Sequence, residues 1–133
     1  MIDTNVIISG ILFPSSIPAR VIEEVSSRHT LVLCSHIIDE LHLVFKRKFK
    51  DKILSLEKFL ERLSFKLIYT PKKIEMTSYP DIPDKSDLPI LVSAILGDID
   101  VLITGDKEFR KVKIDRPEIL SPIEFIERWK PNC

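Results

Sequence analysis

At 133 residues, with 44% apolar and 30% charged residues, the chain has the length and composition of an ordinary soluble domain. Its 20 Lys and Arg balance 20 Asp and Glu, so net charge alone indicates neither a polyanion partner nor an acidic substrate. The two isolated cysteines do not have the pattern of a disulfide framework. No apolar run approaches the ~20 residues of a membrane span, and the start of the chain lacks the features of a signal peptide. We therefore expect a single cytoplasmic domain over residues 1–133.

The predicted elements alternate between helices and short apolar strands. The opening segment NVIISGIL, residues 5–12, is ambiguous because its β-branched residues favour a strand by propensity. Further along, helical spacing predicts helices at 17–27, 35–49, 55–65, 86–97 and 121–129, and short apolar runs predict strands at 28–35, 65–71, 101–106 and 118–122. This alternation predicts an α/β fold with right-handed crossovers onto a parallel sheet.

Small polar residues mark the predicted helix starts. Ser35 is the expected cap of the helix at 35–49, and Ser86 or Asp87 lies near the cap of the helix at 86–97. The last helix has Ser121 as its expected cap and Pro122 at its first position.

Four acids lie at or beside the ends of these elements. Asp3 follows the first strand, Glu40 lies on the helix at 35–49, Asp87 begins the helix at 86–97, and Asp106 follows the strand at 101–106. Because ligands bind beyond the carboxyl ends of parallel strands, Asp3 and Asp106 are expected to face one crevice. Glu40 borders an apolar stripe, where a solvated carboxylate is favoured by about two to one in the absence of a partner.

Clustered carboxylates repel one another unless a hard cation lies among them, and oxygen ligands are those that Mg²⁺ and Mn²⁺ prefer. A metal-activated water can then hydrolyse a phosphodiester. Close to the Glu40 helix, the basic run FKRKFKDK contains Lys46, Arg47 and Lys48, which could hold nucleic-acid phosphates. A solvated helix end explains the same run equally well.

Four segments carry a resemblance: IDTNVIISGIL, LCSHIIDELHLVFKRKF, DLPILVSAILGDIDVLITGDKEF and EILSPIEFI. Together they resemble the PIN-domain nucleases, in particular the toxin components of bacterial and archaeal toxin-antitoxin systems. The resemblance implies a three-layer α/β/α fold with a central parallel sheet of strand order 3-2-1-4-5, and a helix directly after the first strand. It maps the family's catalytic and metal-binding acids onto Asp3, Glu40, Asp87 and Asp106.

The resemblance also maps polar residues that support the metal site onto Asn5 and Thr104. Asp84 and Glu108 are extra acids that we expect behind the ligands or in solvent. The sequence departs from the family at its start, where only Met1 and Ile2 precede Asp3. Two alternatives stay open there: a short central strand, or a chain that begins at an internal methionine.

The resemblance implies a ribonuclease that uses Mg²⁺ or Mn²⁺ to hydrolyse single-stranded RNA, with an antitoxin protein as partner and a homodimer as assembly. One alternative is a haloacid-dehalogenase-like phosphatase, because DTNV and GDKEFR echo that family's motifs, although Asn5 stands where that family needs its second aspartate. Another alternative is an inactive PIN fold that only binds a protein or RNA.

Overall fold

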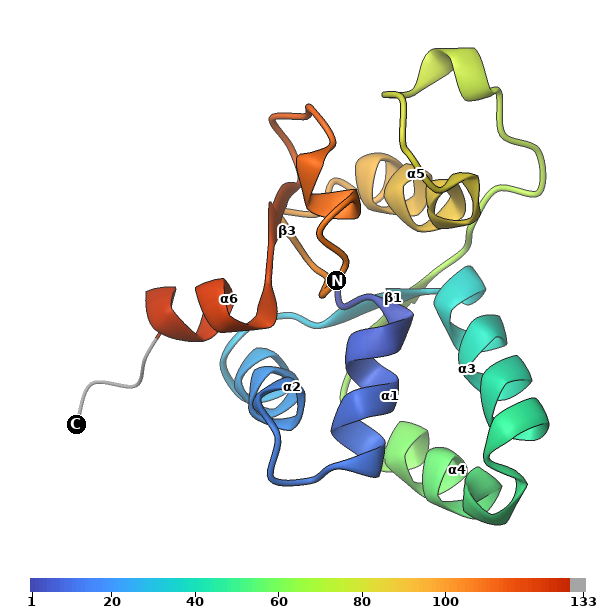
Figure 1. Ribbon diagram of the computed structural model, residues 1–133, viewed down its shortest axis with the longest axis vertical. Helices are drawn as coiled ribbons and strands as arrows, with labels where there is room; N and C mark the ends of the chain where they lie inside the picture. Colours follow the sequence, from blue (N-terminus) through green and yellow to red (C-terminus); the bar gives the residue numbers. More distant parts are fainter. Residues whose placement is uncertain (130–133) are drawn as a thin grey trace.

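Short parallel strands lie at the centre of the structure, a computed structural model that describes residues 1–129 (Figure 1). Strand β1 (Val32–Cys34) pairs in parallel with β2 (Lys66–Ile68). Strand β3 (Val101–Ile103) pairs in parallel with β4 (Glu118–Leu120). The apolar runs of the sequence are therefore strands, but each is only three residues long.

The amino-terminal residues lie beside β3. Ile2 forms a parallel bridge with Ile103, and the ladder includes a bond from the Asp3 N–H to the Ile103 carbonyl at 2.8 Å. Met1 also lines a cavity together with Val32 of β1, which places the start of the chain between β1 and β3. In the expected order 3-2-1-4-5, strand 1 is the amino-terminal segment and strands 2 to 5 are β1 to β4. The observed pairs agree with this order. Within residues 1–129, the first segment has backbone bonds to β3 and none to β1.

Helices surround these strands. They are α1 (Thr4–Leu12), α2 (Ile17–Arg28), α3 (Ser35–Lys48), α4 (Ile53–Arg62), α5 (Leu88–Leu96) and α6 (Pro122–Arg128). Short 3₁₀ turns lie at Lys50–Lys52, Met76–Ser78, Lys85–Asp87 and Phe109–Lys111. In Figure 1, α1, α2 and α4 lie on one side of β1 and α5 lies on the other. The α/β fold class is confirmed.

The ambiguous opening segment is helix α1. The helix begins after Asp3, whose side chain accepts a hydrogen bond from the Thr4 N–H, and it buries Val6, Ile7 and Ile8. Burial of these three consecutive residues in the core outweighs their strand propensity, because propensity is a weak preference beside tertiary packing. The helix implied by the family resemblance is thus correct.

One of the expected helix starts differs in detail. Ser35 is the first helical residue rather than the cap; Cys34 occupies the cap position, and the Ser35 hydroxyl accepts a hydrogen bond from the Thr70 N–H at 2.9 Å. The bond to Thr70 ties the start of α3 to the end of β2. Ser121 does cap α6, in a capping box with Glu124, as the sequence predicts.

The core contains the central residue of one strand in each parallel pair. Ile2, Leu33 and Leu102 are fully buried, and Leu91 of α5 and Leu41 of α3 pack into the same core. Among residues 1–129, no single helix is long and apolar enough to cross a membrane. Helices α1 and α2 together have the length and composition of a membrane span, but the chain bends by 108° between them.

Candidate active site

Asp3 and Asp106 meet at the carboxyl edge of the β3 ladder. Asp3 is buried and directly follows the Ile2 bridge, while Asp106 lies three residues beyond the end of β3. The Thr104 hydroxyl donates to Asp3 Oδ2 at 2.8 Å and accepts from the Asp106 N–H at 3.1 Å. Thr104, which is fully buried, therefore links the two acids.

Glu40 reaches the same region from α3. Its Oε1 accepts a hydrogen bond from the Thr4 hydroxyl at 2.7 Å, and the Nε2 atom of His36 lies 3.6 Å from that same oxygen. The Glu40 side chain is 35% exposed. Because Glu40 has a partner at the start of α1, it is more than a solvated residue flanking the core.

Asp87 completes the set at the start of α5. Burial raises its pKa to about 7, and the negative charges of Asp3, Asp84, Asp106 and Glu40 add to this effect. Repulsion between carboxylates at one site raises the pKa of the group that ionises last. Asp87 is therefore in electrostatic contact with the other three predicted ligands.

The pKa of Asp3 is also raised, mainly because the carboxyl group is buried. Hydrogen bonds from the Thr104 hydroxyl and the Thr4 N–H oppose this shift, and the charges of Glu40 and Asp106 reinforce it. The structure thus brings all four predicted acids into one electrostatically coupled group at the carboxyl edge of the sheet.

The chemistry of these donors fits a hard divalent cation. Carboxylate oxygens are the ligands that Mg²⁺ and Mn²⁺ prefer, and a cation would relieve the repulsion that raises the pKa values of Asp3 and Asp87. As the side chains are placed, no group of three or more His, Cys, Asp or Glu residues within 1–129 is close enough to hold a metal ion. Metal binding at this site would require some of these carboxylates to move closer to one another.

The other predicted site residues are exposed, although the Asp84 charge contributes to the raised pKa of Asp87. Asn5 and Asp84 are exposed, and Asp84 accepts hydrogen bonds from the N–H and hydroxyl of Ser86. Glu108 is exposed and forms an ion pair with Lys111, while its N–H donates to Asp106 Oδ1 at 2.9 Å. The basic residues 46–48 lie exposed in the last turn of α3.

Sequence reasoning missed two residues beside Glu40. Thr4 directly follows Asp3, but its contact with a residue 36 positions away depends on the tertiary fold. His36 and Glu40 lie four residues apart on one helix, a spacing that places side chains on one face and that the sequence does contain.

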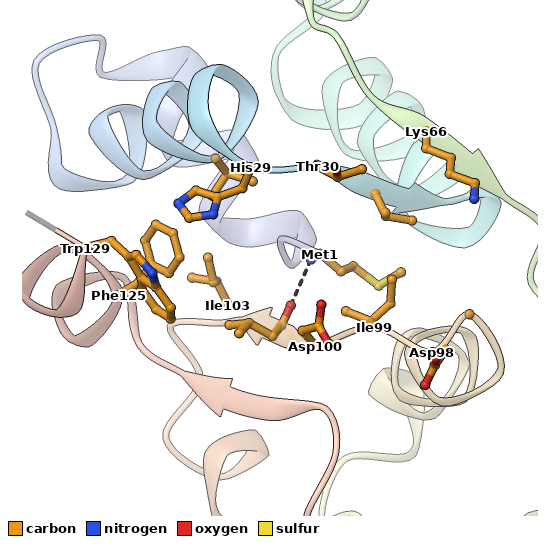
Figure 2. A pocket seen from close by; sticks show the side chains of 14 residues that line it. Met1, His29, Thr30, Lys66, Asp98, Ile99, Asp100, Ile103, Phe125 and Trp129 are labelled. Atoms are coloured by element: carbon orange, nitrogen blue, oxygen red, sulfur yellow. Dashed lines mark hydrogen bonds between the residues drawn. The ribbon is translucent and has the colours of Figure 1, made fainter. Parts of the chain in front are cut away.

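A separate cavity of about 420 Å³ opens at the other edge of the sheet, at the amino ends of β1 and β3 (Figure 2). Figure 2 shows Phe125 and Trp129 at one end of this cavity, and Asp98 at the other. The Met1 ammonium donates to the Val101 carbonyl at 2.9 Å, and burial lowers its pKa to about 5 although the Asp100 charge opposes the shift. None of the four predicted acids lines this cavity.

Fold and site together define an α/β protein with parallel strands and an acidic group at their carboxyl edge. A profile of the PIN domain matches residues 1–108, and the chain therefore belongs to the PIN-domain family. PIN domains are generally nucleases, and these nucleases generally use divalent metal ions. Membership of this family sets aside the haloacid-dehalogenase-like alternative.

Among solved structures, the chain is similar to one in the crystal structure of VapBC2 from Rickettsia felis bound to a DNA fragment from their promoter. The TM-score is 0.65 at 21% sequence identity, and the match covers 91% of this chain and 95% of that chain. At this identity the likeness shows the fold. No curated protein matches the chain.

Proposed function

We propose that this PIN domain is a metal-dependent endoribonuclease that hydrolyses single-stranded RNA and acts as the toxin of a toxin-antitoxin pair. The observation that carries the proposal is that hydrogen bonds through Thr4 and Thr104 link Asp3 to Glu40 and to Asp106. Burial and the charges of these three acids and of Asp84 raise the pKa of the nearby Asp87. Carboxylates that disfavour one another's ionisation are stabilised most by a bound cation. Because the chain belongs to the PIN-domain family, nuclease activity is the reaction in which we expect such a cation to take part.

In this proposal, Asp3, Glu40, Asp87 and Asp106 hold Mg²⁺ or Mn²⁺ directly or through water. The bound ion would supply a water activated for attack on the phosphodiester and a charge that stabilises the leaving oxygen. Thr104 holds one oxygen of Asp3 and the backbone of Asp106, so it fixes their relative position. A bound ion would favour the ionised form of Asp87, because its positive charge offsets the burial and the neighbouring charges that raise the pKa of this carboxyl group.

The basic end of α3 supports RNA as the substrate. Lys46, Arg47 and Lys48 are all exposed and follow Glu40 by six to eight positions on the same helix. Each such cation that contacts a phosphate releases a counterion from the nucleic acid, which favours binding at low salt. The charges are thus available for an RNA strand whose scissile phosphate lies at the acids.

The antitoxin proposal rests on the family resemblance and on an apolar groove. A cavity of about 440 Å³ lies between α1, α2 and α4, with Ile11, Ile22 and Phe59 in its lining and Lys58 and Arg62 among its polar residues. Phe13, directly after α1, is 62% exposed. This surface suits an apolar segment with acidic flanks, and the similar solved chain was crystallised in a VapBC2 complex.

The proposal is tested by incubating the purified chain with single-stranded RNA in the presence of Mn²⁺, Mg²⁺ or EDTA. Cleavage should require the ion and should disappear in Asp106→Asn, whereas Asp115→Asn, which changes an exposed acid outside the coupled group, should cleave like the parent. RNA binding without cleavage under every condition would instead favour the inactive PIN module. A homodimer, which the resemblance implies, is tested separately by sedimentation.

A further inference from the structure

Thr4 contacts two of the proposed ligands at once. Its N–H donates to Asp3 Oδ1 at 2.7 Å, and its hydroxyl donates to Glu40 Oε1, also at 2.7 Å. Thr4 is only 5% exposed, and its bond to Asp3 is buried, whereas its bond to Glu40 is partly buried. Through this one residue, the acid that follows the first strand is connected to the acid on α3.

Glu40 depends on this connection more than Asp3 does. Asp3 also receives the Thr104 hydroxyl, and its backbone is fixed in the β3 ladder. Glu40 has a longer side chain, lies on the helix that follows β1, and receives one side-chain hydrogen bond among the described residues. His36 lies 3.6 Å from the same oxygen, beyond hydrogen-bond distance.

We propose that Thr4 is a positioning residue that holds Glu40 beside Asp3, where Glu40 would serve as a ligand of the metal ion. This inference rests on the proposed function, because it assigns Thr4 a part in the same metal site. A ligand held before the ion arrives has less side-chain freedom to lose on binding. Groups that hydrogen-bond to metal ligands typically contribute about 10- to 100-fold to metal affinity.

Two substitutions separate the hydroxyl from the rest of the side chain. Thr4→Val keeps the branched shape and the N–H bond to Asp3 but removes the bond to Glu40. Thr4→Ser restores a hydroxyl at the same position. Glu40→Gln keeps an oxygen acceptor for Thr4 while removing the charge, and therefore serves as the background for a double-mutant cycle.

The measurement is the Mn²⁺ dependence of the melting temperature, from which a dissociation constant follows for each variant, together with kcat and KM on RNA. Thr4→Val should bind Mn²⁺ about 10- to 100-fold more weakly. Its kcat at fixed Mn²⁺ should fall while KM for RNA stays near that of the parent, and Thr4→Ser should recover most of the affinity. In the Glu40→Gln background, Thr4→Val should change Mn²⁺ affinity by less than about twofold, because the affected ligand is already lost.

A purely structural hydroxyl gives a different pattern. Thr4→Val would then lower the melting temperature without metal but bind Mn²⁺ like the parent, and this result would overturn the inference while leaving the proposed nuclease intact. If instead the parent gains no stability from Mn²⁺ and cleaves no RNA, the proposed function fails and the role of Thr4 fails with it.

Discussion

Replacing Asp87 by asparagine should make the metal-free protein more stable, although it removes a proposed ligand. In the native state the pKa of Asp87 rises from 3.8 to about 7. The native state therefore binds more protons than the unfolded state between these values, and the parent loses stability as pH rises through this window. Asparagine has no proton to lose, so the variant escapes this loss.

The size of the effect follows from the shift. Three pKa units at ~1.4 kcal/mol each give an upper bound of about 4 kcal/mol. Asp87 is partly exposed, so solvent screening reduces this figure to about 2 kcal/mol. The side chain makes no capping hydrogen bond at the start of α5, and asparagine therefore loses only a charge-dipole interaction of roughly 0.3 to 1 kcal/mol. A net gain of about 1 to 2 kcal/mol remains.

Urea unfolding of Asp87→Asn and parent at pH 4 to 8 measures this difference. The gain should be small near pH 4, grow to pH 7 and then stay constant. Asp81→Asn is the matched control, because Asp81 is exposed, pairs with Lys85 and does not contribute to the shift at Asp87. That control should show no gain.

Addition of Mn²⁺ should reverse the order of parent and Asp87→Asn. At a hundredfold excess over its dissociation constant, the ion stabilises the parent by about 2.7 kcal/mol and the variant by much less. Equal stability of the metal-free proteins at pH 8, with equal gains from Mn²⁺, would refute the reasoning that Asp87 belongs to a repelling, metal-binding group.

Three further predictions concern other parts of the chain. Replacing residues 46–48 by alanine should weaken RNA binding and lower the slope of log K against log salt by about 0.7 for each phosphate that no longer has a cationic partner. Fluorescence anisotropy with fluorescein-labelled RNA measures this slope, and an unchanged slope would indicate that the basic run is only a solvated helix end. Thr104→Val should destabilise the protein in urea by about 1 to 3 kcal/mol, because Asp3 loses a buried partner, and Thr104→Ser should cost less. In an Asp87→Asn background, stability should rise with pH between about 5 and 8, because the buried Met1 amine is neutral when folded and protonated when unfolded; acetylation of that amine should abolish the rise.

The sequence predicts the order and type of the elements because their apolar residues recur with clear periods. It predicts their ends less well, as Ser35 shows: a serine before an apolar stripe has the composition of a cap, but its hydroxyl bonds to Thr70, which lies 35 positions away. The opening segment illustrates the same limit. Local propensity favours a strand there, and only the core that receives Val6 and Ile7 makes it a helix.

The acids of the candidate site were predictable in type and in part in position. Asp3 and Asp106 follow strands, and the geometry of parallel sheets brings such residues to one edge. The sequence also places Glu40 and Asp87 on predicted helices, but their proposed role as ligands came from the family resemblance, because nothing local to a helix surface distinguishes a ligand from a solvated carboxylate. The contact between Thr4 and Glu40 was beyond reach, since it depends on how α1 and α3 pack.

The backbone ladder at the centre of the fold is discontinuous, and this divides the site between two parts of the sheet. Asp3 and Asp106 lie on the β3 side of the sheet, because Asp3 follows the Ile2 bridge and Asp106 follows β3. Glu40 lies on the other side, on α3, which begins directly after β1. Within the described chain, side-chain packing and the Thr4 hydroxyl, rather than strand hydrogen bonds, connect these two sides near the acids. A cation bound by acids from both sides would therefore act as a removable cross-link, so the ion used for catalysis would also govern how freely the two halves of the sheet move apart.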